Sequence, residues 1–118
     1  MAKYEVLRIN SDDTIQSIEF DDYNIDLLFL QQIGSTIQIV RSGFFRDILI
    51  CCDDNGKVLH KPFNRLATFL YGQYPADFIV GDIFVGSSFV PDHNDLEPDM
   101  YALTSSRSAE LKKILSHF

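Results

Sequence analysis

Cysteine and tryptophan are scarce in this chain of 118 residues, which contains two cysteines and no tryptophan. The cysteines, Cys51 and Cys52, are neighbours in an apolar stretch that has the character of a strand. Neighbouring side chains of a strand point to opposite faces, so a disulfide between them would be strained. Without a Cys-x-x-Cys spacing, two cysteines also exclude a disulfide framework and a structural zinc site. We interpret both as small buried hydrophobes in a reducing compartment.

Long apolar runs and catalytic signatures are also missing. No uninterrupted apolar segment approaches the ~20 residues of a membrane-spanning helix, and no apolar leader follows Met1. We therefore expect a cytoplasmic protein that does not associate with membranes. The sequence contains no Gly-x-Ser-x-Gly elbow, no glycine-rich phosphate loop and no His-Glu-x-x-His pair. We expect no enzymatic activity, no metal and no cofactor.

Positive charge is in short supply, because 10 Lys and Arg residues face 17 Asp and Glu residues and leave a net charge of −7. Residues 1–40 contain seven acids and two bases, and residues 66–106 contain six acids and no base. Only the middle of the chain, residues 41–65, is basic, with five bases and three acids. Nucleic-acid-binding proteins present a basic stripe, so we expect no direct contact with nucleic acid. The basic middle segment remains compatible with a small anion.

The N-terminal third contains alternating strand and helix patterns. Tyr4–Ile9 and Thr14–Phe20 predict a β-hairpin, because the Asn-Ser-Asp-Asp segment between them has turn composition. Apolar residues then recur with helical spacing over Ile25–Ile33, and Gly34 follows where a left-handed helix cap belongs. Thr36–Val40 alternates between apolar and polar residues, as a half-buried strand does.

The stretch Ile48–Gly86 carries the densest pattern of the chain. An apolar run, an Asp-Asn-Gly turn and the return segment Lys57–His60 predict a second hairpin. Asn64 is placed to cap a short helix that Gly72 ends. A further strand is predicted over Phe78–Val85. Together these elements form a predicted ββαβ unit.

The last part of the chain begins with an acidic, proline-bounded loop over residues 91–99. Its Asp92, His93 and Asp95 are metal-ligating residue types without the fixed spacing of a metal site, so we interpret the loop as solvated surface. A C-terminal helix is predicted over about residues 106–118, with Ser106 as its cap, and we expect it to pack on its own domain. Its apolar face consists of Leu111, Ile114, Leu115 and Phe118.

These patterns predict one α+β domain over residues 1–118. We expect a mostly antiparallel sheet of six or seven strands, two packed helices on one face, and the C-terminal helix closing the domain. The predicted strand Thr36–Val40 contains no charge and no proline, so nothing blocks its edge against pairing. We therefore predict a homodimer whose interface is this strand or the apolar face of the C-terminal helix.

Four short motifs follow one another in a characteristic order. They are Leu30-Gln31-Gln32-Ile33-Gly34, the acidic turn Asp53-Asp54-Asn55-Gly56, Asn64-Arg65-Leu66-Ala67, and Ile79-Val80-Gly81-Asp82. Over about residues 4–90 this order resembles a domain-of-unknown-function family of small proteins from bacteriophages and bacterial mobile elements. Ser35 stands where the second glycine of the first motif is usual. The resemblance implies a genomic setting and the cytoplasm of a bacterial host, and it lends no catalytic residue.

The predicted central unit brings a set of candidate ligand residues together. Asn64-Arg65 stands at a predicted helix start, where N–H groups and a guanidinium favour an anion; a structural N-cap beside a solvated arginine is the simpler alternative. Gly81-Asp82 interrupts an apolar strand and marks a bulge or the close approach of a ligand. We interpret His60 as structural. The candidate ligand-binding residues are Asn64, Arg65, Lys57, Lys61, Tyr71, Tyr74, Gly81 and Asp82, with the tyrosines available to stack on a base.

We expect a small, non-enzymatic accessory protein of a phage or mobile element, with a role in counter-defence. It would capture a small phosphorylated or nucleotide-like ligand of the host, an expectation that rests on the basic middle segment and on the Asn64-Arg65 pair. The alternative is an acidic protein that imitates DNA and inhibits a host nucleic-acid enzyme by binding it directly. The acids outside residues 41–65 motivate that alternative.

Overall fold

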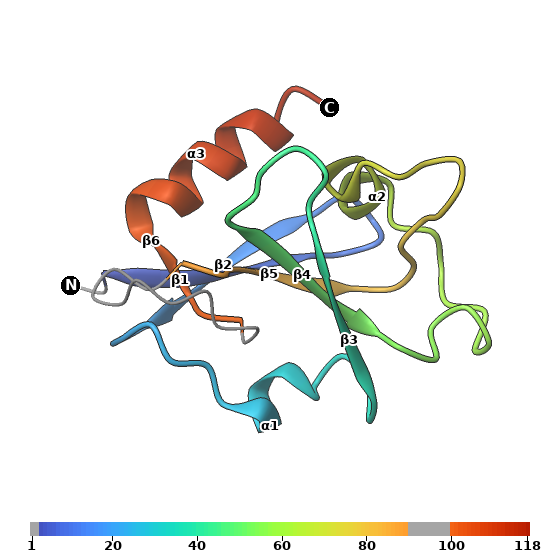
Figure 1. The fold of residues 1–118 in the computed structure, drawn as a ribbon, viewed down its shortest axis with the longest axis horizontal. Helices are drawn as coiled ribbons and strands as arrows, with labels where there is room; N and C mark the ends of the chain where they lie inside the picture. Colours follow the sequence, from blue (N-terminus) through green and yellow to red (C-terminus); the bar gives the residue numbers. More distant parts are fainter. Residues whose placement is uncertain (1–2, 90–99) are drawn as a thin grey trace.

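An antiparallel sheet runs through the computed structural model, which describes residues 3–89 and 100–118 (Figure 1). Within these residues the strands are β1 (Tyr4–Ile9), β2 (Ile15–Phe20), β3 (Ile37–Arg41), β4 (Ile48–Asp53), β5 (Ile83–Ser87) and β6 (Leu103–Thr104). The helices are α1 (Leu27–Leu30), α2 (Arg65–Tyr71) and α3 (Ser105–Leu115). The strands follow the order β2-β1-β5-β4-β3, and β6 pairs with the start of β1. The predicted α+β class, with a mostly antiparallel sheet and a C-terminal helix, is confirmed.

The strands β4 and β5 lie in the interior of the sheet. Every residue of both strands is buried. Since neither face of these strands meets solvent, their sequences are nearly continuous apolar runs instead of alternating ones. Cys51 and Cys52 point to opposite faces of β4, and each packs into a different hydrophobic cluster. Both cysteines are free and buried, in agreement with their interpretation as small hydrophobes.

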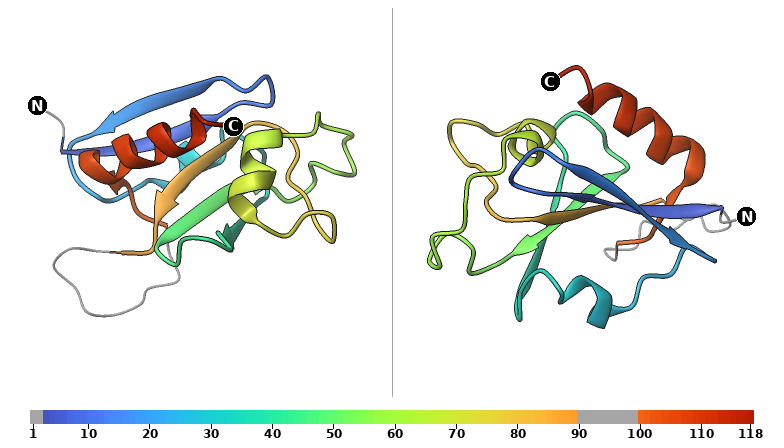
Figure 2. Two further views of the ribbon diagram at one scale, coloured as in Figure 1. Left: turned by 90° about the horizontal axis from the view of Figure 1, so that it is seen from above. Right: turned by 180° about the vertical axis from the view of Figure 1, so that it is seen from behind.

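Helices cover both faces of the sheet. On one face α2 and α3 bury Leu66, Leu70 and Leu111 (Figure 2). On the other face α1 and the turn after it bury Leu30 and Ile33 (Figure 1). We expected the first two helices to share a face, and this detail is wrong. β2 and β3 form opposite edges of the sheet, so the connection between them, which carries α1, has to cross one face. The connection from β4 to β5 carries α2 and lies over the other face.

The ends of α1 and α2 show which local sequence signals are enough to define where a helix begins and ends. α2 begins and ends as predicted, since the Asn64 side chain accepts a hydrogen bond from a first-turn N–H and Gly72, at a φ of 78°, ends the helix. α1 is only four residues long and does not extend over Ile25–Ile33. Gly34 is no left-handed cap. A Cβ there would lie 2.5 Å from Cγ of Asp53, so glycine is required for the close approach of that carboxylate.

The C-terminal helix α3 packs on its own domain, as predicted. Thr104 caps it, two residues before the predicted cap Ser106, and its side chain accepts a hydrogen bond from the N–H of Arg107. Leu111 and Leu115 of this helix are buried within the chain's own core. In the described part of the chain, no helix has the length and apolar character needed to span a membrane.

The second predicted hairpin does not form. Consecutive turns over residues 54–60 follow β4, and Lys57–His60 is not a strand. Both edges of β4 are already paired, one with β3 and the other with β5, so neither is left for a third strand. The turns close instead through bonds such as the one from Lys61 N–H to the Gly56 carbonyl oxygen, at 3.0 Å. The strand predicted over Phe78–Val85 likewise begins only at Ile83.

Candidate functional site

Asn64 is the predicted site residue that connects several buried segments of the chain. Its side chain is fully buried. The amide nitrogen Nδ2 donates to the carbonyl oxygens of Ile9, at 3.0 Å, and Gly81, at 2.8 Å. The amide oxygen accepts from the N–H of Ala67 at 3.0 Å. Asn64 therefore ties β1, the segment before β5 and the first turn of α2 together, and its hydrogen-bonding groups are engaged inside the chain.

Arg65 points away from this junction. Its guanidinium pairs with the Asp13 carboxylate at 3.1 Å and donates to the carbonyl oxygen of Phe118 at 2.8 Å. The structure therefore brings Asn64 and Gly81 together, whereas Arg65 and Asp82 take different ion-pair partners, Asp13 and Arg8. Since α2 has only seven residues and its first turn is capped by Asn64, its N-terminus offers little to an anion.

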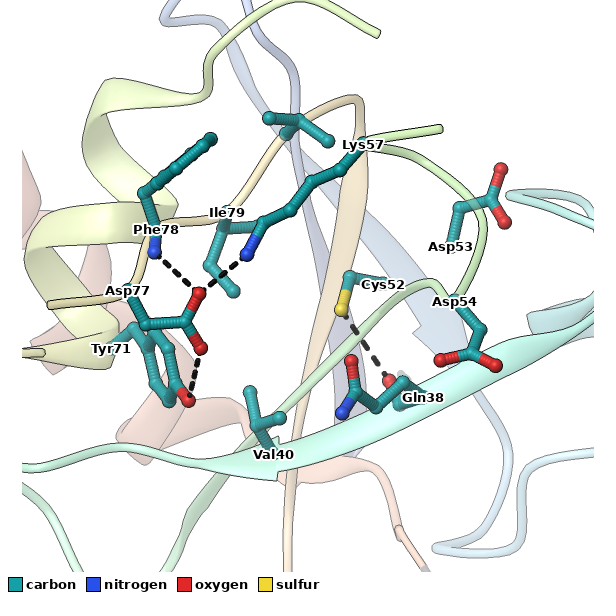
Figure 3. Close-up of a pocket in the computed structure, with 11 residues that line it drawn as sticks. Gln38, Val40, Cys52, Asp53, Asp54, Lys57, Tyr71, Asp77, Phe78 and Ile79 are labelled. Carbon is teal, nitrogen blue, oxygen red and sulfur yellow. Dashed lines mark hydrogen bonds and ion pairs between the residues drawn. The ribbon is translucent and has the colours of Figure 1, made fainter. Parts of the chain in front are cut away.

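A cleft of about 240 Å³ lies between β3, the turn after β4, and the segment after α2 (Figure 3). We call it the Lys57–Asp77 cleft. Two predicted ligand residues, Lys57 and Tyr71, line it, and Asp77 joins them. The Asp77 carboxylate accepts from Nζ of Lys57 at 2.5 Å, from the hydroxyl of Tyr71 at 3.0 Å and from the N–H of Phe78 at 2.8 Å. The remaining walls are formed by Gln38, Val40, Cys52, Asp53, Asp54, Ile79 and Val80.

The charges in the Lys57–Asp77 cleft are predominantly negative. The hydrogen bond from Lys57 holds the pKa of Asp77 below its usual value, so Asp77 is ionised at neutral pH. Burial and the hydrogen bond to Asp77 raise the pKa of Tyr71, which keeps its proton. Burial, with the neighbouring carboxylates, raises the pKa of Cys52 to about 11. The Lys57 ammonium lies 4.4 Å from the ring centre of Phe78, a cation–π contact at the mouth.

A second cleft of about 400 Å³ holds three more of the predicted residues, Lys61, Gly81 and Asp82. Here Asp82 pairs with Arg8 at 3.1 Å and accepts from the N–H of Ser11 at 3.0 Å. Gly81 has a φ of 75°, and a Cβ on it would lie 2.9 Å from Cδ of Lys61. The glycine thus allows the close approach of the Lys61 side chain, which accounts for it without a ligand.

Lys61 ends at a buried carboxylate. Its ammonium lies 2.7 Å from Asp53, whose side chain is 4% exposed, and donates to the Ile33 carbonyl oxygen at 2.8 Å. Burial acts to raise the pKa of Asp53, but hydrogen bonds from Lys61 and from the N–H of Asn55 outweigh it and hold that pKa below its usual value. Lys61 and Asp53 therefore join the end of β4 to the turn after α1.

Tyr74, the last of the predicted residues, lines neither cleft. It is exposed and makes an edge contact with Phe63 at a ring separation of 6.2 Å, and Phe63 in turn contacts Phe78 at 5.9 Å. Phe63 and Tyr74 therefore lie outside the Lys57–Asp77 cleft and contact it through Phe78, which lines it.

Sequence reasoning missed Asp77, Phe78, Asp53 and Arg8. Lys57 and Asp77 are 20 residues apart, and their pairing depends on the turn that replaces the predicted hairpin. The sequence signal that was available is the acid at position 77 directly before an apolar run. In the described residues, no three His, Cys, Asp or Glu side chains gather to hold a metal ion. Asp92, His93 and Asp95 lie outside those residues.

The fold and clefts define a small α+β domain with polar, ion-paired surface sites. A family model described as "Domain of unknown function (DUF3846)" matches residues 3–111, so the chain belongs to this family. The match confirms the predicted relationship to a domain-of-unknown-function family. None of the curated proteins and none of the solved structures compared with the chain matches it.

Proposed function

We propose that this protein is a non-enzymatic binding protein that captures a small phosphorylated or nucleotide-like ligand in the Lys57–Asp77 cleft. The observation that supports the proposal is the convergence of a cation, an ionised carboxylate and an aromatic ring on one cleft, from Lys57, Asp77 and Phe78. Ligand sites are concave and carry a few such convergent polar groups. The cleft volume of about 240 Å³ suits one ring system of the ligand.

The exposed ion pair between Lys57 and Asp77 allows Lys57 to exchange its partner Asp77 for a ligand. The Lys57 and Asp77 side chains are 50% and 43% exposed, and an ion pair with this exposure contributes at most about 1 kcal/mol. A phosphate group forms charge-assisted hydrogen bonds with lysine and replaces Asp77 as its partner. Asp77 and Gln38 then accept and donate hydrogen bonds at the edge of a base, while Phe78 contacts its face. The acidic walls favour a ligand with few phosphates.

The resemblance to phage and mobile-element proteins supplies the biological setting of the proposal. A small protein that sequesters a host signalling nucleotide in the bacterial cytoplasm would act in counter-defence without catalysing a reaction. The ligand would then be a host metabolite or signal, and the protein would need only abundance and affinity.

Calorimetry against a panel of nucleoside monophosphates and cyclic dinucleotides tests the proposal. We expect one member to bind and Lys57→Met to weaken it about tenfold, the effect of losing one charge-assisted contact of ~1.4 kcal/mol. Lys113→Met is the matched control, because Lys113 is an exposed lysine of α3 outside the cleft. Arg65→Ala weakens binding only if the ligand sits at the start of α2. The absence of heat with every member, or equal losses in both lysine variants, would refute the proposal.

A further inference from the structure

The outer edge of β3 is unpaired within the described residues, since β3 is the last strand of the order β2-β1-β5-β4-β3. The carbonyl oxygen of Thr36 accepts from the N–H of Asp54, and the N–H of Ser42 donates to β4. Hydrogen bonding alternates along an antiparallel strand. The even-numbered residues of β3 therefore bond to β4, and the backbone groups of Ile37, Ile39 and Arg41 are directed to the free edge.

A groove lined mainly by apolar side chains lies beside this edge, on the α1 face of the sheet. It has a volume of about 280 Å³. Ile37 and Ile39 of β3 form one wall and Leu27 and Leu30 of α1 form another. Ile39 is 37% exposed and Leu27 is 57% exposed, so large apolar side chains face solvent here. The lining is completed by Asn24, Ile25, Met100 and Tyr101.

The connection before α1 is negatively charged, whereas the C-terminal end of β3 carries the exposed Arg41, whose guanidinium donates to the carbonyl oxygen of Arg46. The connection from β2 to α1 contains Asp21, Asp22 and Asp26, all exposed, and Asp26 directly precedes Leu27 of the groove. No Lys or Arg occurs between Arg8 and Arg41 in the sequence. Among the described residues, none of these three aspartates takes part in an ion pair. A partner that brings positive charge would meet uncompensated carboxylates.

We propose that the β3 edge and its groove bind an extended, basic segment of a partner protein, which adds a strand to β3. The outward backbone groups of Ile37, Ile39 and Arg41 supply the hydrogen bonds of such an added strand. Alternate apolar side chains of the segment enter the groove, and its flanking Lys or Arg residues pair with the acids before α1. The surface is separate from the Lys57–Asp77 cleft, which Gln38 and Val40 line from the opposite face of β3.

Charge distinguishes this partner from a second copy of the chain. Each copy carries a net charge of −7, so pairing two copies would bring like net charges together. The other interface predicted for a homodimer is unavailable at its centre, because Leu111 and Leu115 are buried in their own domain. A positively charged segment can form hydrogen bonds with the free backbone groups of β3 and ion pairs with the aspartates before α1.

A designed peptide tests the proposal directly. The probe is a fluorescent peptide with a Val-Thr-Val-Thr-Val centre and two lysines at each end, and the control peptide has glutamates in place of the lysines. We expect the lysine peptide to bind at least tenfold more tightly than the glutamate peptide in anisotropy titrations at low salt. Binding should weaken about tenfold when salt is raised from 0.05 to 0.5 M, since screening shortens the Debye length.

Two adjacent leucines provide the matched variants. Leu27 lines the groove, whereas its neighbour Leu28, 74% exposed on the same helix, does not. We expect Leu27→Ala to weaken the lysine peptide about fivefold and Leu28→Ala to change its affinity less than twofold, with circular dichroism confirming that both variants are folded. Equal affinity for the two peptides, or equal effects of the two leucine variants, would overturn the proposal. A dimer in light scattering that Leu27→Ala dissociates would assign the groove to a second copy instead, and would also overturn it.

Discussion

Asn64 and Asp77 both join distant segments through side-chain hydrogen bonds, but one is buried and the other is exposed to solvent. Each side chain makes three hydrogen bonds, and each joins segments that are distant in the sequence. Asn64 is fully buried, whereas the Asp77 side chain is 43% exposed. A buried hydrogen-bonding group has no water to replace a lost partner, but an exposed one exchanges partners at little cost. The comparison separates a junction that stabilises the fold from an exposed cluster whose hydrogen-bond partners can exchange.

Asn64→Ala tests the buried side of this comparison and has the largest expected effect. It removes the cap of α2 and the hydrogen bonds that its amide nitrogen donates to the carbonyl oxygens of Ile9 and Gly81 in the core. We expect the free energy of unfolding in urea to fall by about 3 to 5 kcal/mol, as the sum of a lost cap and two lost hydrogen bonds in the core. The neighbouring Arg65→Ala is the control and should cost less than about 1 kcal/mol. Similar losses in both variants would remove the distinction.

Asp53→Asn tests a buried ion pair that stands between these two cases. The Asp53 side chain is 4% exposed and its partner Lys61 is 29% exposed. Loss of the carboxylate charge leaves the Lys61 ammonium partly buried without its counter-ion, so we expect a destabilisation of about 2 kcal/mol in urea unfolding. Asp54→Asn, which removes an equal charge from an exposed neighbour, controls for the change in net charge. A loss below about 0.5 kcal/mol for Asp53→Asn would place this pair with the exposed ones.

The same pair predicts how stability depends on pH. The pKa of Asp53 in the folded chain lies below its ordinary value of 3.8. Its stabilising contribution is therefore complete above the unfolded pKa and is lost as the pH falls through the lower, folded-state pKa. We expect the free energy of unfolding to decrease from pH 5 to pH 2.5, and Asp53→Asn to decrease less over that range. Identical pH profiles for the two proteins would show that the protonation of Asp53 does not contribute to the pH dependence of the unfolding free energy.

Asp77→Asn tests the exposed side and has the smallest expected effect on stability. Asparagine retains an acceptor for Tyr71 but loses the ion pair with Lys57. Because both partners are about half exposed, we expect the unfolding free energy to change by less than about 1 kcal/mol. The measurement is the urea midpoint of the variant against that of the parent. A loss comparable to that of Asn64→Ala would mean that the cleft is structural and would weaken the case for a ligand.

Local chemistry accounts for the elements that the sequence predicts correctly. Asn64 and Gly72 define α2, because a helix cap depends on residues within one turn of the helix end. The proximity of Asn64 and Gly81 also follows from the predicted β-α-β order and is present at 2.8 Å. The burial of Cys51 and Cys52 follows from their position in an apolar strand.

Long-range competition explains the predictions that are wrong. The turn composition after Cys52 predicts a hairpin, but whether Lys57–His60 can pair depends on β3 and β5, which already occupy both edges of β4. Five of the eight predicted ligand residues divide between two clefts, and the other three line neither, for the same reason. Lys57 turns toward Asp77 and Lys61 toward Asp53, and no local pattern encodes which acid a surface lysine meets. Opposite placement of α1 and α2 depends on the strand order, which periodicity does not reveal.

The adjacent cysteines of β4 can report which of the two hydrophobic clusters is exposed first when the sheet opens. Cys51 lies in the cluster under α1 and Cys52 in the cluster under α2 and α3. Burial raises the pKa of Cys51 to about 12, so neither thiol reacts readily in the closed state. Unequal alkylation rates, read by mass spectrometry, would identify which core loosens first. Because Cys52 also lines the Lys57–Asp77 cleft, a ligand there should slow the labelling of Cys52 alone and leave Cys51 as the internal reference.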